Sequence, residues 1–279
     1  MVSSTMGLGI RAYGDDYILA NRREYTQLIE VARDNGITML DTADFYAGGD
    51  VERMLGASLG VRRGGFLVST HGGVRFSRIG SPIIDASPAY LAMACDASLR
   101  RLRTDCIDLY YLSGVDPLLP VEESMGKLSD LVTAGKIRYI GMYGASRVDL
   151  RRAHRIHPIS VLAVEYSLRY RAAERDKLLA AAELGVGAVA YWPLARGLLA
   201  GGRRATSELE SNGIRAVETE AAELDIGMAR LALAWLLRRG DVLVVPGTRN
   251  PAHLEMNASA TDIRLNSDVC SRLDRVFPP

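Results

Sequence analysis

Residues 36 to 73, GITMLDTADFYAGGDVERMLGASLGVRRGGFLVSTHGG, form the stretch that decides the fold predicted for this chain. It holds two short apolar runs, Ile37 to Leu40 and Phe66 to Val68, each of which ends in polar residues. Between these runs, apolar residues recur at the three- and four-residue spacing of an amphipathic helix: Val51, Met54, Leu55 and Leu59. The stretch therefore predicts one βαβ unit, in which a helix connects two buried strands.

Three polar or aromatic side chains follow the two strands of this unit. Asp41 and Tyr46 come after the first strand, and His71 comes after the second. Because the carboxyl ends of parallel strands meet at one open rim, we expect these three side chains to converge. A carboxylate, a phenol and an imidazole at one rim are typical of acid-base chemistry.

The same alternation of strand and helix continues to the end of the chain. A helix is expected from about Arg22 to Asp34, with Asn21 and Glu24 spaced as a capping box. Ser87 is placed to cap a helix beginning at Pro88. Further strands are predicted at 107–112, 137–142, 161–165, 187–191 and 242–245, with helices at 88–102, 121–134, 148–156, 173–184 and 231–239. Eight alternations without a linker predict an α/β protein, a (β/α)8 TIM barrel, as a single domain over residues 1–279.

The composition and charge of the chain indicate which kind of partner it binds. The chain of 279 residues is 48% hydrophobic and carries a net charge of +1, with arginines scattered rather than gathered in tracts. Neither nucleic acid nor an anionic membrane is therefore expected as a partner, and a small-molecule substrate fits better. The sequence leaves the oligomeric state open.

The cysteines and the amino terminus indicate the compartment. Cys95, Cys106 and Cys270 are an odd number at no metal-ligand spacing, so we expect free thiols and no metal. No signal-peptide pattern and no run of ~20 apolar residues is present. A cytoplasmic protein is expected.

Seven blocks of the sequence resemble one known family. DTADFYAGGDVERMLG is similar to the DTAxxYGxGxSExxLG signature of the aldo-keto reductases. Six more blocks follow in the order of that family: IDLYYLSGVDP, GKIRYIGMYGAS, VEYSL, AYWPLARGLLAG, LALAWLL and VVPGTRNPAHLEMN. The resemblance implies the same barrel, and an enzyme in which a nicotinamide gives hydride to a carbonyl while a tyrosine supplies the proton.

Two of the four catalytic positions of the family are changed. The resemblance carries the family's aspartate onto Asp41 and its tyrosine onto Tyr46. The lysine position reads His71, in STHGG, and the histidine position reads Ser113, in LYYLSGVDP. We expect Asp41 to orient His71 as a general base, with Tyr46 as the matching acid or oxyanion donor. Ser113 keeps one hydroxyl for hydrogen bonding but carries no charge.

The positions that would hold a nicotinamide cofactor are changed as well. Tyr143 to Ala145 and Ala163 stand where the family clamps the nicotinamide amide, and Trp192 replaces a small serine beside the diphosphate. The segment 201–216 is shorter than the family stretch that covers the cofactor. These changes predict no cofactor, with NADPH binding weak or absent.

At the adenine end of the cofactor site, the sequence matches the family at more positions than at the nicotinamide end. Arg249 and Asn257 match it and would bind a nicotinamide cofactor if one is retained, although Met256 and His253 are altered positions. The rim aromatics Tyr143, Tyr191 and Trp192 are expected to line a substrate pocket instead.

Three functions from different classes remain open. The first is an enzyme without a nicotinamide that dehydrates, isomerises or cyclises a small oxygenated carbonyl or hydroxyl metabolite. The alternative is an NADPH-dependent aldo-keto reductase or dehydrogenase with a remodelled tetrad, and the second alternative is a non-catalytic binding barrel. Titration with NADPH separates the first two.

Overall fold

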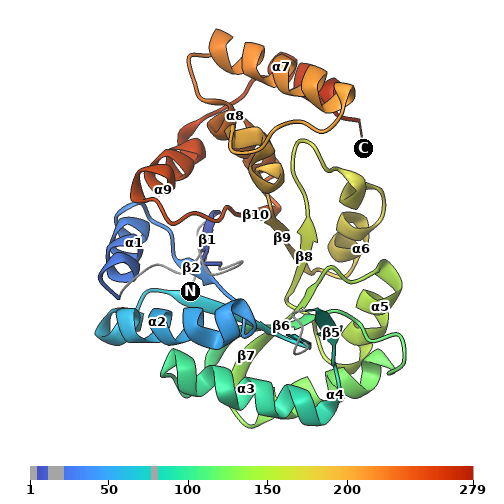
Figure 1. Ribbon diagram of the computed structural model, residues 1–279. Helices are drawn as coiled ribbons and strands as arrows, with labels where there is room; N and C mark the ends of the chain where they lie inside the picture. Colours follow the sequence, from blue (N-terminus) through green and yellow to red (C-terminus); the bar gives the residue numbers. More distant parts are fainter. Residues whose placement is uncertain (1–4, 12–21, 77–80, 279) are drawn as a thin grey trace.

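Eight parallel strands form the centre of the molecule (Figure 1). The computed structural model describes residues 5–11, 22–76 and 81–278. In sheet order the strands are β1 (Gly7–Gly9), β2 (Met39–Asp41), β3 (Leu67–Gly72), β6 (Ile107–Ser113), β7 (Ile137–Tyr143), β8 (Val161–Glu165), β9 (Gly187–Tyr191) and β10 (Val242–Val245). Each strand therefore pairs with its neighbour in the chain, as a barrel built from successive βα units requires.

The first and last strands come together to close the ring. Parallel bridges join Met6 with Val244 and Gly9 with Gly247. The backbone N–H of Gly9 also donates to the carbonyl of Pro246 at 3.0 Å. The predicted (β/α)8 barrel is confirmed.

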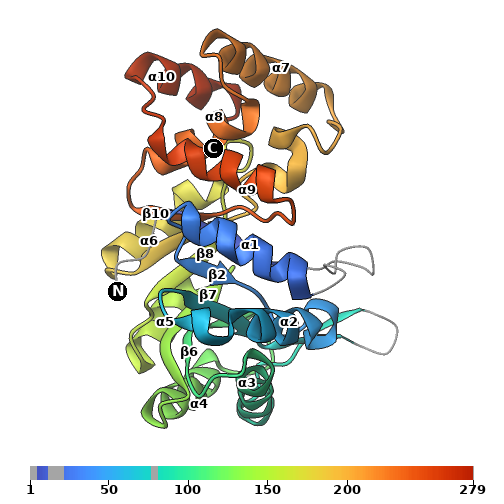
Figure 2. The ribbon, with the colours of Figure 1, turned by 90° about the vertical axis from the view of Figure 1, so that its left-hand side faces the viewer.

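Helices surround the strands, as Figure 1 shows along the barrel. They are α1 (Arg22–Asp34), α2 (Asp50–Leu59), α3 (Pro88–Leu102), α4 (Val121–Thr133), α5 (Arg147–Ile156), α6 (Lys177–Glu183), α7 (Glu208–Glu223), α8 (Met228–Leu237), α9 (Pro251–Ala258) and α10 (Ser267–Val276). In Figure 2, α7 and α10 lie together at the top, beside α8. Within the described ranges, no helix has the length and apolar character needed to cross a membrane.

Side chains alternate between the inside of the barrel and the layer beneath the helices. Met39, Leu109, Tyr111, Val189 and Val245 pack together as one cluster, whereas Leu40 and Tyr110, one position along, belong to the larger cluster under the helices. This alternation follows from the two-residue period of a strand. It also fixes which residues at the strand ends point into the mouth of the barrel.

Several element boundaries differ from those predicted. The strand expected at Phe66 to Val68 runs from Leu67 to Gly72, so His71 lies inside it. The helix expected from Ala173 is interrupted at Asp176, whose φ of −146° is not helical, and divides into a 3-10 turn and α6. The short hairpin of β4 (Val74–Phe76) and β5 (Pro82–Ile84) was not predicted. Asn21 of the expected capping box lies outside the described residues.

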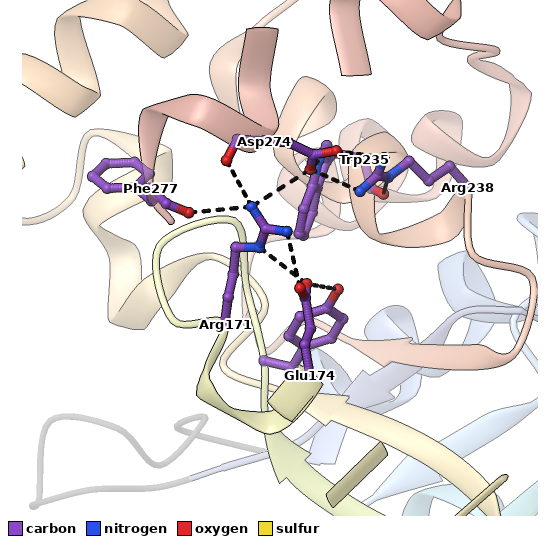
Figure 3. Close-up of polar contacts among 7 residues, drawn as sticks. Arg171, Glu174, Trp235, Arg238, Asp274 and Phe277 are labelled. Carbon is purple, nitrogen blue, oxygen red and sulfur yellow. Dashed lines mark hydrogen bonds and ion pairs between the residues drawn. The ribbon is translucent and has the colours of Figure 1, made fainter. Parts of the chain in front are cut away.

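Arg171 holds the carboxyl-terminal helix against the barrel (Figure 3). Its Nη1 donates to the backbone carbonyls of Asp274 at 2.8 Å and Phe277 at 3.2 Å, while Nε and Nη2 both bond the Glu174 carboxylate. Its guanidinium also lies 5.1 Å from the Trp235 ring. The carbonyls at the end of α10, which have no partner within the helix, are thereby satisfied by a charged donor.

Candidate active site

The site residues predicted from the sequence lie at the mouth of the barrel. Asp41, Ser113, Tyr143 and Tyr191 each end a strand, and His71 is the penultimate residue of β3. They share the strand phase of the interior residues beneath them, because Met39, Leu109 and Val189 each precede one by two or four positions and belong to the interior cluster. The strands therefore direct these side chains toward one another at the carboxyl rim.

His71 lies between a carboxylate and a hydroxyl. Its Nε2 atom is 3.4 Å from Asp41 Oδ1, and its Nδ1 atom is 2.8 Å from Ser113 Oγ. Ser69 Oγ donates a further hydrogen bond of 2.6 Å to Asp41 Oδ1. Asp41, His71 and Ser113 are all buried, with 6%, 3% and 4% of their surfaces exposed. Both ring nitrogens thus face partners inside the protein.

Asp41 is held in its charged form. Burial by itself raises the pKa of this carboxyl, but the charge of His71 and hydrogen bonds from His71 and Ser69 outweigh burial. The charge of Arg11 acts in the same direction, and the net effect lowers the pKa of Asp41 below its ordinary value. When the imidazole is neutral, a charged Asp41 favours its proton on Nε2, which leaves Nδ1 to accept from Ser113.

Aromatic rings fix the plane of the imidazole. The Tyr111 ring lies 4.6 Å from the His71 ring, and Tyr143 meets it edge-on at 4.9 Å. Gly141 makes room for Tyr111, since a Cβ at position 141 would lie 2.5 Å from the Tyr111 ring. A larger residue at position 141 would therefore displace the Tyr111 ring, which packs on His71.

Tyr46 lies at the same rim, in the 3-10 turn Tyr46–Gly49 that follows β2. It is buried, and its ring meets the Phe45 ring edge-on at 4.8 Å. Phe45 in turn lies 5.8 Å from Phe76 of the hairpin. The loop is anchored near the imidazole because the backbone N–H of Asp44 donates to the carbonyl of His71 at 3.4 Å. Tyr46 thus has an apolar aromatic wall beside it.

The three aromatics predicted to line a substrate pocket form a row. Tyr143 stacks on Tyr191 with ring centroids 4.2 Å apart and planes 12° apart, and Tyr191 meets Trp192 edge-on at 5.2 Å. Trp192 also carries the Arg196 guanidinium 3.7 Å from its ring centroid. These rings pack on one another, so the stacked faces of Tyr143 and Tyr191 are covered.

A cleft of about 530 Å³ opens beside this row. Residues from the end of β1, from the loop after β9 and from the loop into α9 line it, among them Arg11, Trp192, Arg196, Arg249, His253 and Asn257. α9 begins in this wall, with its N-terminus capped by the Asn250 side chain. Arginines beside a helix N-terminus favour a ligand that carries phosphate groups.

Comparison with known proteins agrees with this architecture. The sequence profile described as the Aldo/keto reductase family matches residues 5–277. The chain belongs to the aldo/keto reductase family. Glycerol dehydrogenase from Gluconobacter oxydans has the same fold, with a TM-score of 0.88 at 24% identity over 98% of this chain and 91% of its own.

Two further solved structures are 28% identical to this chain, with 99% of this chain and 92% of theirs covered. One is the aldo/keto reductase from Klebsiella pneumoniae in complex with NADP and acetate, with a TM-score of 0.82. The other is the holo form of an aldo-keto reductase from Bacillus halodurans, with a TM-score of 0.86.

The NADP complex contradicts the expectation that this family member works without a cofactor and binds NADPH weakly or not at all. That expectation treated Trp192 as a side chain filling the space of a diphosphate. In the structure Trp192 is instead one wall of an open cleft, and Arg249 and Asn257, the two positions kept at the adenine end, line the same cleft. The cleft is assembled from several segments, so changes at single positions did not remove it.

Three contributors to the site were not identified from the sequence. Arg11 lines the cleft and lowers the pKa of Asp41. It follows the short apolar run Met6 to Ile10, just as the other rim residues follow their runs. Ser69 bonds Asp41, and Tyr111 packs on His71. Both side chains point into the barrel, and each lies two positions before a rim residue of its own strand, His71 or Ser113. Applying the two-residue period to each predicted strand would have found Ser69 and Tyr111.

The buried carboxyl of Asp44, in the same loop as Tyr46, should make the stability of the protein depend on pH. Burial, with the negative charge of Glu52, raises its pKa to about 8, against the opposing effects of Arg101, the Phe45 backbone and Tyr90. The folded protein therefore keeps a proton that the unfolded chain releases above about pH 4, and stability falls as pH rises from about 4 to 8. We expect Asp44→Asn to flatten this fall and to stabilise the protein by about 2–3 kcal/mol at pH 8. A rigid site would give ~1.4 kcal/mol for each unit of the pKa shift, and we take roughly half of that value because the site can relax.

Urea unfolding at pH 5, 6, 7 and 8 measures this effect. Asp50→Asn, at an exposed carboxyl paired with Arg53, is the matched control and should leave the pH dependence of the parent unchanged. Parallel pH curves for the parent and for Asp44→Asn would contradict the assignment.

Proposed function

We propose that this aldo/keto reductase is an NADP(H)-dependent oxidoreductase that interconverts a small carbonyl compound and the matching alcohol. The cleft of about 530 Å³ that opens beside the row of rim aromatics is the observation that carries the proposal. Its arginines and the N-terminus of α9 suit the phosphates of a dinucleotide. The NADP complex of the Klebsiella pneumoniae relative supports the same cofactor.

Two arginines and one asparagine of the cleft would hold the cofactor. Arg249 and Arg196 would bind phosphate oxygens through charged hydrogen bonds, and the buried Asn257 would bind the adenosine end. When bound, the nicotinamide supplies or accepts the hydride.

The proton would move between His71, Ser113 and the substrate oxygen, while the charged Asp41 orients the imidazole. With the imidazole proton on Nε2 toward Asp41, the Ser113 hydroxyl donates to Nδ1, and its oxygen can accept from a substrate alcohol. In the reductive direction a protonated His71 donates from Nδ1 to Ser113 Oγ, and Ser113 donates to the carbonyl oxygen. Tyr46 would be the second hydrogen-bond donor to that oxygen. This route differs from the direct base expected from the sequence, because both imidazole nitrogens face protein partners.

Titration and turnover test the proposal. We expect saturable NADPH binding by the parent protein, and NADPH oxidation when a panel of small aldehydes and ketones is added. Arg249→Ala should weaken NADPH binding by about tenfold or more, since a hydrogen bond to a charged group contributes ~1.5–3 kcal/mol. Arg264→Ala, at an exposed arginine bonded to the Thr261 carbonyl, is the control. Absence of saturable NADPH binding by the parent would rule the proposal out.

A further inference from the structure

A continuous row of rings separates the acid-base residues from the cleft. Tyr143 lies 4.9 Å from His71, 4.2 Å from Tyr191, and Tyr191 lies 5.2 Å from Trp192. Of these, Trp192 alone is among the residues that line the cleft in the described part of the chain. The cleft therefore stops at the indole and does not reach His71.

Hydride transfer requires the two reacting carbons to be in contact, about 3–3.5 Å apart. A substrate oxygen bonded to Ser113 or Tyr46 places the substrate carbon beside His71. A nicotinamide bound from the cleft must therefore reach the space between His71 and Tyr191. That space holds the Tyr143 ring.

Tyr143 is packed there as a flat ligand would be. Its ring is nearly parallel to that of Tyr191, at 12°, with ring centroids 4.2 Å apart, so the two rings are stacked face to face. On the basis of the proposed function, we propose that the Tyr143 ring occupies the nicotinamide position of the cofactor-free protein and swings aside when NADP(H) binds.

The place of Tyr143 in the chain suits such a rotation. Tyr143 is the last residue of β7 and is only half-buried. The next residue is Gly144, and only the Tyr191 hydroxyl, 3.8 Å away, lies near the position of an added Cβ there. The proposed movement is a rotation of the side chain at this strand end, in which the ring parts from Tyr191 and from Tyr111, whose ring centroid lies 6.4 Å away. The adenosine end of the cleft, at Arg249 and Asn257, is formed by other segments and is independent of that movement.

Removing the ring gives the test. We expect Tyr143→Ser to bind NADPH roughly 2- to 10-fold more tightly than the parent, because no stacked pair has to be separated first. Binding of adenosine 2′,5′-bisphosphate, which has no nicotinamide, should be unchanged. Trp192, in the cleft wall, provides the fluorescence signal for both ligands.

Rapid mixing adds a readout that affinity alone does not give. For the parent, the observed rate of NADPH binding should level off at high NADPH as ring rotation becomes limiting, whereas Tyr143→Ser should show a rate that rises linearly. Tyr143→Phe keeps the stacked ring and should behave as the parent. Tyr139→Ser, at an exposed tyrosine of the same strand, is the control for loss of a tyrosine from β7.

The outcomes separate this inference from the proposed function. If the parent binds NADPH and Tyr143→Ser binds it no more tightly and with the same kinetics, Tyr143 does not occupy the nicotinamide position. If neither protein binds NADPH, the proposed function fails, and this inference fails with it. Circular dichroism spectra that match the parent establish that the variants are folded.

Discussion

We expect replacement of His71 with alanine to lower turnover in the proposed NADPH-dependent carbonyl reduction by about 10²- to 10⁴-fold, the usual contribution of a general acid-base group. The reason is the position of the imidazole, 3.4 Å from Asp41 and 2.8 Å from Ser113. No other described side chain links that carboxylate to that hydroxyl in the structure. Steady-state turnover at saturating NADPH measures the effect, and affinity for adenosine 2′,5′-bisphosphate should stay near that of the parent because His71 does not line the cleft.

The pH dependence identifies the role of the imidazole. Reduction consumes a proton, which the proposed relay delivers through His71, so the rate should fall as pH rises. His71→Ala should lose this limb of the profile. His157→Ala, at a histidine beside the end of α5, should keep both the rate and the limb. An unchanged pH profile in His71→Ala would mean that the imidazole takes no part in proton transfer.

A second variant distinguishes relay from direct transfer. Ser113→Ala removes the hydroxyl between His71 and the substrate, so a relay predicts a loss of turnover comparable to that of His71→Ala. Were Ser113→Ala fully active while His71→Ala is not, the imidazole would act on the substrate directly, as the sequence alone suggested. Tyr46→Phe tests the second donor in the same assay.

The arrangement of the barrel could be predicted because it depends on short-range patterns. β8, β9 and β10 lie where the sequence places them, since each is a short apolar run bounded by turn residues. The Ser87 side chain accepts from the N–H of Tyr90, as a cap before Pro88 should. The rule that parallel strands share a rim then placed Asp41 and His71 together, although 30 positions separate them.

The contacts of the site could not be predicted because they depend on residues from distant segments. The direction of each His71 nitrogen is set by Asp41 on β2 and Ser113 on β6, and no local pattern records it. The stacking of Tyr143 on Tyr191 likewise joins two strand ends that are far apart in the chain. The expectation that no cofactor binds was wrong for the same reason. From the sequence alone Trp192 was expected to fill the space of a diphosphate, whereas in the structure it lies in the wall of the cleft.

Arg101→Ala is expected to lower the free energy of unfolding by about 3–5 kcal/mol, the cost of leaving a buried charge without its partner. Glu52, on α2, is fully buried, and its Oε2 atom accepts a hydrogen bond of 2.5 Å from Arg101 Nε on α3. Its Oε1 atom accepts a bond of 2.6 Å from the hydroxyl of Thr70, the residue before His71. This ion pair therefore joins two helices to the strand that carries the imidazole.

Urea unfolding of three variants separates the buried charge from simple loss of an arginine. Arg100→Ala, at the exposed neighbour on α3, should change stability by no more than about 0.5 kcal/mol. Adding Glu52→Gln to Arg101→Ala should recover about half of the loss, because the amide carries no charge and its oxygen still accepts from Thr70. If Arg101→Ala costs no more than Arg100→Ala, Glu52 is not held by this pair. If the double variant is less stable than Arg101→Ala, the penalty does not come from the buried charge.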